Sequence, residues 1–213
     1  MGEKSEKTEK KTEEKKEGKT KTIVKKRTVD KWKKKTWFTI IAPKEFDRKE
    51  LGSTIAEKEE NVMNRTIWAN VRDLTNQPKK QHISILFKVN EVKGSKAYAI
   101  AVGHEIREGY LRKFIRRRSS KIEMVQTVTL KNGDNLRVKT VVVTGNKSDR
   151  NRETDLRKVV KEVMEQSVSN QDSQQVISEL VFGSIPQKIF DEAKRILQIK
   201  RIEITKSSIM PGK

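Results

Sequence analysis

The 213-residue chain contains no cysteine, and aromatic residues make up only 5% of it. Without cysteine the chain can form no disulfide, no thiolate metal site and no cysteine nucleophile. It has no run of about 18 apolar residues that could cross a bilayer, and its N-terminus has no apolar signal-peptide core, so we do not expect export by that route. It also has no strongly amphipathic basic helix with aromatic anchors, which argues against a membrane surface as a partner.

Residues for catalysis are equally scarce. His82 and His104 are the only histidines, and at their strand positions each is interpreted as structural. The sequence has no His-Glu-X-X-His zinc motif, Walker loop or Gly-X-Ser-X-Gly elbow. Its carboxylates, such as Glu105, Glu123 and Asp149, are too scattered to predict a paired-carboxylate site. We therefore predict no enzyme, no catalytic residue, no cofactor and no metal site.

Positive charge is what the sequence has in excess. Lysine and arginine number 49 against 29 aspartates and glutamates, which gives a net charge of +20. A charge of this size favours a polyanionic partner, because every phosphate that a cation neutralises releases condensed counterions.

The first 22 residues consist almost entirely of lysine, glutamate, threonine, serine and glycine. No apolar side chain occurs between Met1 and Ile23, so nothing there can offset the entropy of ordering. Residues 1–22 are therefore predicted to be a disordered tail, and residues 207–213 a short basic one. We expect a single domain over residues 23–206.

A first basic cluster follows the tail, with Trp32 inside it and Trp37 just beyond it. Aromatic rings among cations can stack on unpaired bases while the cations follow the backbone. Either indole could instead cover the first strand of the core, the reading we favour for Trp37 but leave open for Trp32. The predicted RNA-binding residues of this cluster are Lys25, Lys26, Arg27, Lys31, Trp32, Lys33, Lys34 and Lys35.

A second basic cluster lies in residues 106–121, where apolar residues recur at three- and four-residue steps. This spacing predicts a short helix with one face in the core. The cations on its outer side and past its last turn are Arg112, Lys113, Arg116, Arg117 and Arg118. They could simply form a solvated face. The arginine triplet (Arg116, Arg117 and Arg118) favours RNA binding instead, because only Glu108 lies nearby to offset the repulsion among these charges.

Alternating or β-rich segments predict six strands, at residues 36–42, 65–74, 82–92, 98–103, 122–130 and 136–144. The last two are joined by Lys131-Asn-Gly-Asp134, where Asn-Gly is typical of a hairpin turn with positive φ angles. Residues 45–53 are interpreted as a loop with a turn of helix. Antiparallel neighbours are plausible for every strand, so we expect an antiparallel, mostly closed β-barrel over residues 36–144.

The apolar period changes to 3.6 residues after residue 153. Three helices are predicted within residues 154–198: one capped by Thr154, a second that stops at Gly183 and a third over residues 184–197. A final strand is expected at residues 199–205. The fold class is therefore α+β, a barrel with attached helices.

Several segments, in order along the chain, resemble the archaeal and eukaryotic small-subunit ribosomal proteins of the eS-one family, formerly S-three-A-e. The most specific is Gly103-His-Glu followed by Tyr-Leu-Arg-Lys-Phe-Ile-Arg-Arg-Arg-Ser-Ser-Lys-Ile at residues 110–122. The other matching segments are residues 37–46, 51–54, 82–92, 136–139, 156–164 and 193–204. The resemblance is closest to the archaeal members. The tail before Thr22 lies outside it, and residues 145–151 do not clearly follow the family pattern.

The resemblance implies a non-catalytic component of cytoplasmic ribosomes. It implies binding to ribosomal RNA on the platform of the small subunit, near the messenger exit and the 3′ end of the RNA. Neighbouring ribosomal proteins, and messenger RNA at the exit, are the other partners to expect. Two other readings suit the charge: a free-standing DNA- or chromatin-binding protein, and an RNA-processing enzyme whose site assembles only in three dimensions.

Overall fold

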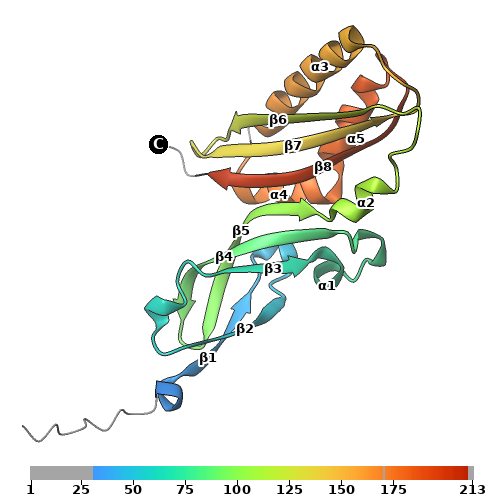
Figure 1. Ribbon diagram of the computed structural model, residues 1–213. Coiled ribbons are helices and arrows are strands. Elements are labelled where there is room, and N and C mark those ends of the chain that lie inside the picture. Colours follow the sequence, from blue (N-terminus) through green and yellow to red (C-terminus); the bar gives the residue numbers. More distant parts are fainter. Residues whose placement is uncertain (1–30, 170, 211–213) are drawn as a thin grey trace, which may run out of the picture. The chain divides into compact units, whose positions relative to one another are not determined.

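The computed structural model describes residues 31–169 and 171–210 (Figure 1). The chain divides into a unit that ends at Lys34 and a unit that begins at Lys35. In the first unit the structure describes one 3₁₀ turn, Lys31–Lys34. The predicted disorder of residues 1–22 lies outside the described residues, as do Lys25, Lys26 and Arg27. The predicted domain limits stay predictions.

Eight strands form one mixed sheet in the described part of the second unit. They are β1 (Thr36–Ile41), β2 (Glu50–Ala56), β3 (Thr66–Asn70), β4 (Ile83–Lys93), β5 (Lys96–Ile106), β6 (Lys121–Thr129), β7 (Asn135–Thr144) and β8 (Ile199–Met210). The helices are α1 (Val71–Thr75), α2 (Glu108–Arg112), α3 (Arg150–Val168), α4 (Ser173–Phe182) and α5 (Ser184–Ala193). The α+β class is thus confirmed.

The predicted closed, antiparallel barrel is wrong. The strand order is β2-β1-β5-β8-β7-β6, with β4 also on β5 and β3 on β4, and the described strands do not close on themselves. β1 pairs with β5 in parallel. One edge of β5 pairs with β4, whereas the other edge pairs with β1 near Lys96 and with β8 near Glu105. The six predicted strands form no closed antiparallel ring, because the edge of β5 opposite β4 is divided between the parallel strand β1 and β8 from the far end of the chain.

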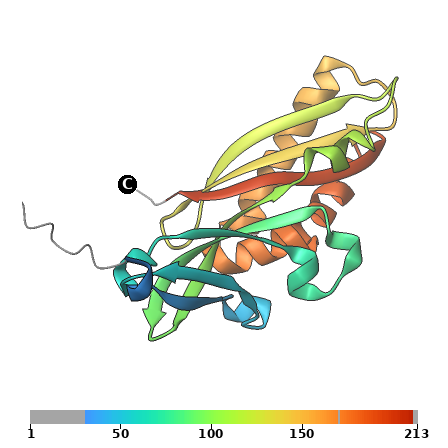
Figure 2. The same cartoon turned by 60° about the horizontal axis from the view of Figure 1, so that its bottom comes forward.

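Two hydrophobic cores lie on this sheet. One fills the space within β1–β5, and the other lies between β6–β8 and helices α3, α4 and α5. Helix α4 contributes to both, because Ile177 and Val181 enter the first core while Val176 and Leu180 enter the second. The three helices lie on one face of β6–β8, as the turned view shows (Figure 2).

Several local predictions are confirmed, among them β1, the β4–β5 pair, the β6–β7 hairpin and the end of α4 at Gly183, whose φ is 95°. In the hairpin turn, however, Gly133 alone has a positive φ, 79°. Its amide donates to the carbonyl of Leu130, and the amide of Leu130 donates to Asp134. The hydrogen bonds close the turn around the predicted residues 131–134, but Asn132 does not adopt the positive φ that was predicted for it.

Other boundaries were wrong. β2 lies where a loop was expected, and the strand predicted to reach residue 74 stops at Asn70, whose side chain accepts the amide of Arg72 and caps α1. Thr154 does not cap α3 but lies inside it, where its hydroxyl donates to the carbonyl of Arg150. Helix α5 ends at Ala193, four residues early, and β8 runs to Met210, five residues beyond its predicted end.

Candidate nucleic-acid interface

The arginine triplet lies on the loop between α2 and β6, not on a helix. The short helix predicted from the apolar residues between Ile106 and Ile115 shrinks to the five residues of α2, and Ile106 is still in β5. Arg112, Lys113 and all three arginines of the triplet are exposed. A turn holds the triplet in place: the Arg116 amide donates to the Ser119 hydroxyl (3.2 Å), which donates to the Arg116 carbonyl (2.6 Å).

The first anchor of this loop is aromatic. The rings of Tyr110 and Phe114 meet edge to face, with centroids 5.0 Å apart. The guanidinium of Arg201, on β8, lies 5.0 Å from the Phe114 ring and donates to the Tyr110 hydroxyl at 2.9 Å. Leu111 is buried beside them. The expectation that this segment anchors to the core holds, although a loop rather than a helix then carries the arginines.

The second anchor ties the loop to the end of β7. The amide of Ser120 donates to the Thr144 hydroxyl oxygen at 2.9 Å, and the Thr144 amide donates back to the Ser120 carbonyl at 3.0 Å. The hydroxyl of Ser120 accepts the amide of Ser148 at 3.1 Å. The loop after β7 therefore lies directly against the loop that carries the arginine triplet.

A third segment joins them at the start of β8. The backbone amide of Gly145 donates to the carbonyl of Gln198 at 2.9 Å, and the side-chain amide of Asn146 donates to the Gln198 side-chain oxygen at 3.3 Å. Three segments that are remote in sequence thus meet at one end of the β6–β8 strands (Figure 1). We call their exposed cations the basic end: Arg116, Arg117, Arg118, Lys147, Arg150, Arg152 and Lys200.

The basic end is not neutralised by its own surroundings. Within residues 31–169 and 171–210, no carboxylate lies within 4.0 Å of the side-chain nitrogens of these seven residues. The nearby Glu153 is engaged elsewhere, by the Ser148 hydroxyl at 2.7 Å and by Arg157 at 3.6 Å. Clustered cations on anchored loops create a positive field that suits a polyanion.

Four residues of the basic end were not among the predicted site residues: Lys147, Arg150, Arg152 and Lys200. One feature of the sequence could have predicted that Lys147 lies near the arginine triplet. A β-hairpin places the start of its first strand beside the end of its second, so the residues before β6 and after β7 had to be neighbours. Lys200 carried no such signal, since its position depends on β8 pairing with β7.

The first basic cluster is described only in part. The 3₁₀ turn spans Lys31–Lys34. Within it Trp32, Lys33 and Lys34 are exposed, and Lys35 is exposed just after it. Trp37 is 64% exposed, so the reading that it covers the core is wrong. The alternation of β1 explains this, because Phe38 and Ile40 take the core-facing positions and leave Trp37 on the opposite face.

Both histidines have structural surroundings. His104 is buried between β5 and β8, with Nε2 2.8 Å from the Ile204 carbonyl and Nδ1 2.6 Å from the Ser207 hydroxyl. A carbonyl only accepts, so Nε2 carries the proton. Burial lowers the pKa of His104 to about 4. His82 stacks on Tyr110, with ring centroids 3.6 Å apart.

The described residues contain no group of three or more histidine, aspartate or glutamate side chains that could hold a metal ion. No helix among them is both long and apolar enough to span a membrane.

Comparisons with known proteins assign the family. The model of the Ribosomal S3Ae family matches residues 23–211. Small ribosomal subunit protein eS1 of Sulfurisphaera tokodaii is 34% identical over 85% of this chain and 94% of its own length. The proteins of that name from Sulfolobus acidocaldarius (36% identical, 85% of this chain and 92% of the relative) and Haloarcula marismortui (34%, 82% of each) are similar. With a match of this extent and collinear segments, the chain belongs to the Ribosomal S3Ae family, a family of ribosomal proteins.

Proposed function

We propose that the chain is a structural constituent of the small ribosomal subunit and that it binds ribosomal RNA through its basic end. The relatives are named small ribosomal subunit protein, which supports the proposal that this chain is part of the small subunit. The observation that carries the RNA contact is the gathering of seven exposed cations from three segments with no carboxylate partner in the described chain.

The contact is mainly to phosphates. The helix nearest the triplet, α2, has only five residues, so no helix presents these arginines to a groove. Affinity then comes from backbone charge, and specificity comes from the shape of RNA that fits all three fixed segments at once. Arg112 and Lys113 extend this surface, with Arg112 partly offset by Glu108 at 3.6 Å.

The first basic cluster supplies a second contact in this proposal, with its lysines on phosphates and the ring of Trp32 stacking on an unpaired base. The family resemblance supports a position on the platform of the subunit, near the messenger exit and the 3′ end of the RNA. There the chain would touch neighbouring ribosomal proteins, and messenger RNA at the exit is a further contact to test.

The test replaces Arg116, Arg117 and Arg118 with alanine and measures incorporation into small subunits by sedimentation at moderate salt. A matched control replaces three exposed lysines on other loops and on α5, Lys58, Lys131 and Lys188, and so removes the same charge. We expect the arginine variant to be lost from subunits and the lysine variant to be retained.

The same pair of variants is compared for binding to purified small-subunit RNA as salt is raised. Each lost phosphate contact reduces the slope of log affinity against log salt by about 0.7 to 0.9, so the triplet should change it by about 2 to 3. Unchanged incorporation with an unchanged slope would remove the triplet from the interface. A chain absent from small subunits but bound to DNA would contradict the proposed function itself.

A further inference from the structure

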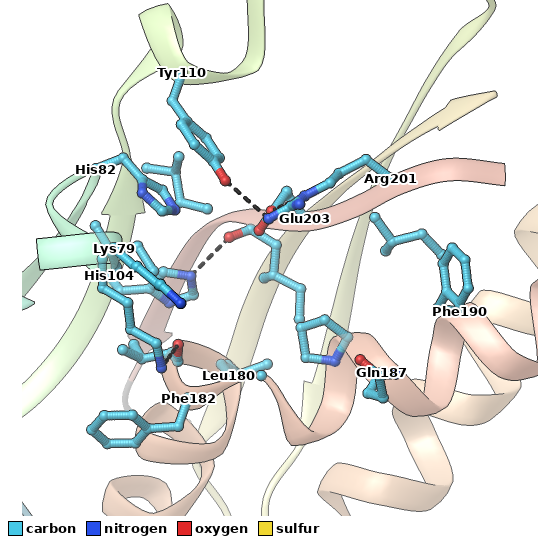
Figure 3. Close-up of a pocket in the computed structure, with 18 of the residues that line it drawn as sticks. Lys79, His82, His104, Tyr110, Leu180, Phe182, Gln187, Phe190, Arg201 and Glu203 are labelled. Carbon is cyan, nitrogen blue, oxygen red and sulfur yellow. Dashed lines mark hydrogen bonds and ion pairs between the residues drawn. The ribbon is translucent and has the colours of Figure 1, made fainter. Parts of the chain in front are cut away.

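A pocket of about 440 Å³ lies beside the basic end, in the second unit (Figure 3). Its walls come from the 3₁₀ turn Pro78–Lys80, the end of β5, the C-terminal end of α4, helix α5 and the start of β8. Lys200 belongs both to the lining of this pocket and to the basic end. An RNA held at the basic end would therefore pass close to the pocket.

Aromatic rings line the pocket on more than one side. The stacked pair His82 and Tyr110 stands on one side, and Phe190 of α5 stands on another, as the close-up shows. Burial, and then the charge of Arg201, lower the pKa of His82, so its ring is neutral at neutral pH. Flat, uncharged rings offer stacking surfaces for a nucleobase.

The charged groups of the pocket are mostly cationic. Lys79 and Lys200 are exposed, and Lys80 lies 4.4 Å from the centroid of the Phe182 ring. The carboxylate of Glu203 is already paired, at 2.7 Å, with Arg201. The Tyr110 hydroxyl accepts from Arg201, so its own proton is free to be donated. The pocket thus combines apolar rings, a few hydrogen-bonding groups and a positive rim.

We propose that this pocket receives one unpaired nucleotide of the ribosomal RNA, with its base among the aromatic rings and its phosphate at Lys79 and Lys200. The volume is within the range of small-ligand pockets. The positive rim favours a nucleotide over a peptide side chain, because only the nucleotide brings a phosphate with every base. This inference rests on the proposed binding to ribosomal RNA.

The experiment crosslinks small subunits with short-wave ultraviolet light and identifies the joined peptides and nucleotides by mass spectrometry. Two glutamines make a matched pair of variants. Gln187 is exposed on α5 and lines the pocket, whereas Gln175 is exposed on α4 and does not. Gln187→Trp fills the pocket without changing the charge, and Gln175→Trp adds the same ring elsewhere. A second pair, Lys79→Glu and Lys58→Glu, reverses one charge at the rim and one on a distant loop.

We expect the unmodified protein, Gln175→Trp and Lys58→Glu to give nucleotide crosslinks on the peptides that carry Tyr110, Phe182 or Phe190. Gln187→Trp and Lys79→Glu should lose most of these crosslinks and keep those near the arginine triplet. Equal pocket crosslinks in all variants, or pocket crosslinks only to another protein, would overturn the inference. Crosslinks near the triplet without any in the pocket would also overturn it and leave the proposed function intact. Loss of all RNA crosslinks in the unmodified protein would contradict the proposed function.

Discussion

Thr144 and Ser120 are joined by two hydrogen bonds, one in each direction, and a backbone amide donates each of them. The Ser120 amide donates to the Thr144 hydroxyl oxygen at 2.9 Å, and the Thr144 amide donates to the Ser120 carbonyl at 3.0 Å. The Thr144 hydroxyl also donates to the carbonyl of Asn146 at 2.6 Å. One buried side chain at the end of β7 thereby fixes both the loop before β6 and the loop after β7.

Replacing Thr144 with valine keeps the shape of this side chain and removes its hydroxyl. The amide of Ser120 and the carbonyl of Asn146 then lose a partner in a partly buried place, so we expect the free energy of unfolding to fall by about 1 to 2 kcal/mol. Denaturant unfolding measures it. Thr127→Val, at an exposed position of β6, is the control and should change stability by less than about 0.5 kcal/mol. Equal effects would show that the Thr144 hydroxyl does not hold the loops.

His104 makes stability depend on pH. Its pKa is about 4 in the folded chain, chiefly because it is buried, against an ordinary value of 6.5. The unfolded chain therefore binds more protons between these values, so stability is full above about pH 6.5 and falls as the pH approaches 4. Over this range the free energy of unfolding falls by about 3 kcal/mol. Unfolding measured across this range should show the slope, and His104→Gln should remove most of it. A slope that survives the substitution would assign the effect to other groups.

At Gly103 the backbone of β5 lies close against that of β8. A Cβ added there would clash with the backbone carbonyl of Ser207, whereas one added at Gly109 of α2 would meet nothing. We expect Gly103→Ala to lower the free energy of unfolding by about 1 to 3 kcal/mol. Gly109→Ala should leave it unchanged or raise it by about 0.5 to 1 kcal/mol. If both variants unfold like the unmodified chain, the close approach of the two strands is wrong.

Local patterns in the sequence predicted most elements, and the misses have physical causes. β4 and β5 alternate between apolar and polar residues, and α3 has an apolar stripe on one face. Each pattern lies within one continuous segment of the sequence, so each element could be predicted. The parallel pairing of β1 with β5 and the insertion of β8 depend on contacts between remote segments. No local period encodes these contacts, which is why a closed barrel was expected in place of an open mixed sheet.

Of the candidate site, too, only the part encoded in adjacent residues could be predicted. The arginine triplet was visible because its charges are adjacent in sequence, but its support was predicted as a helix and is a loop. Lys147 and Lys200 join the triplet only through the hairpin and through β8, so charge density along the chain could not group them.

If the basic end faces ribosomal RNA, a probe attached there should lie close to the RNA backbone. Because the chain has no cysteine, a single introduced cysteine can carry an iron chelate that cleaves nearby RNA with hydroxyl radicals. Asn151→Cys, exposed between Arg150 and Arg152, places the chelate at the basic end without removing a charge. Asn132→Cys places it in the exposed hairpin turn at the other end of β6 and β7.

In small subunits assembled with each variant, the positions of cleavage in the RNA are mapped by primer extension. The account predicts strong, localised cleavage from residue 151, at RNA positions that differ from any cleaved from residue 132. Absence of cleavage from residue 151, in subunits shown to contain the variant, would contradict it.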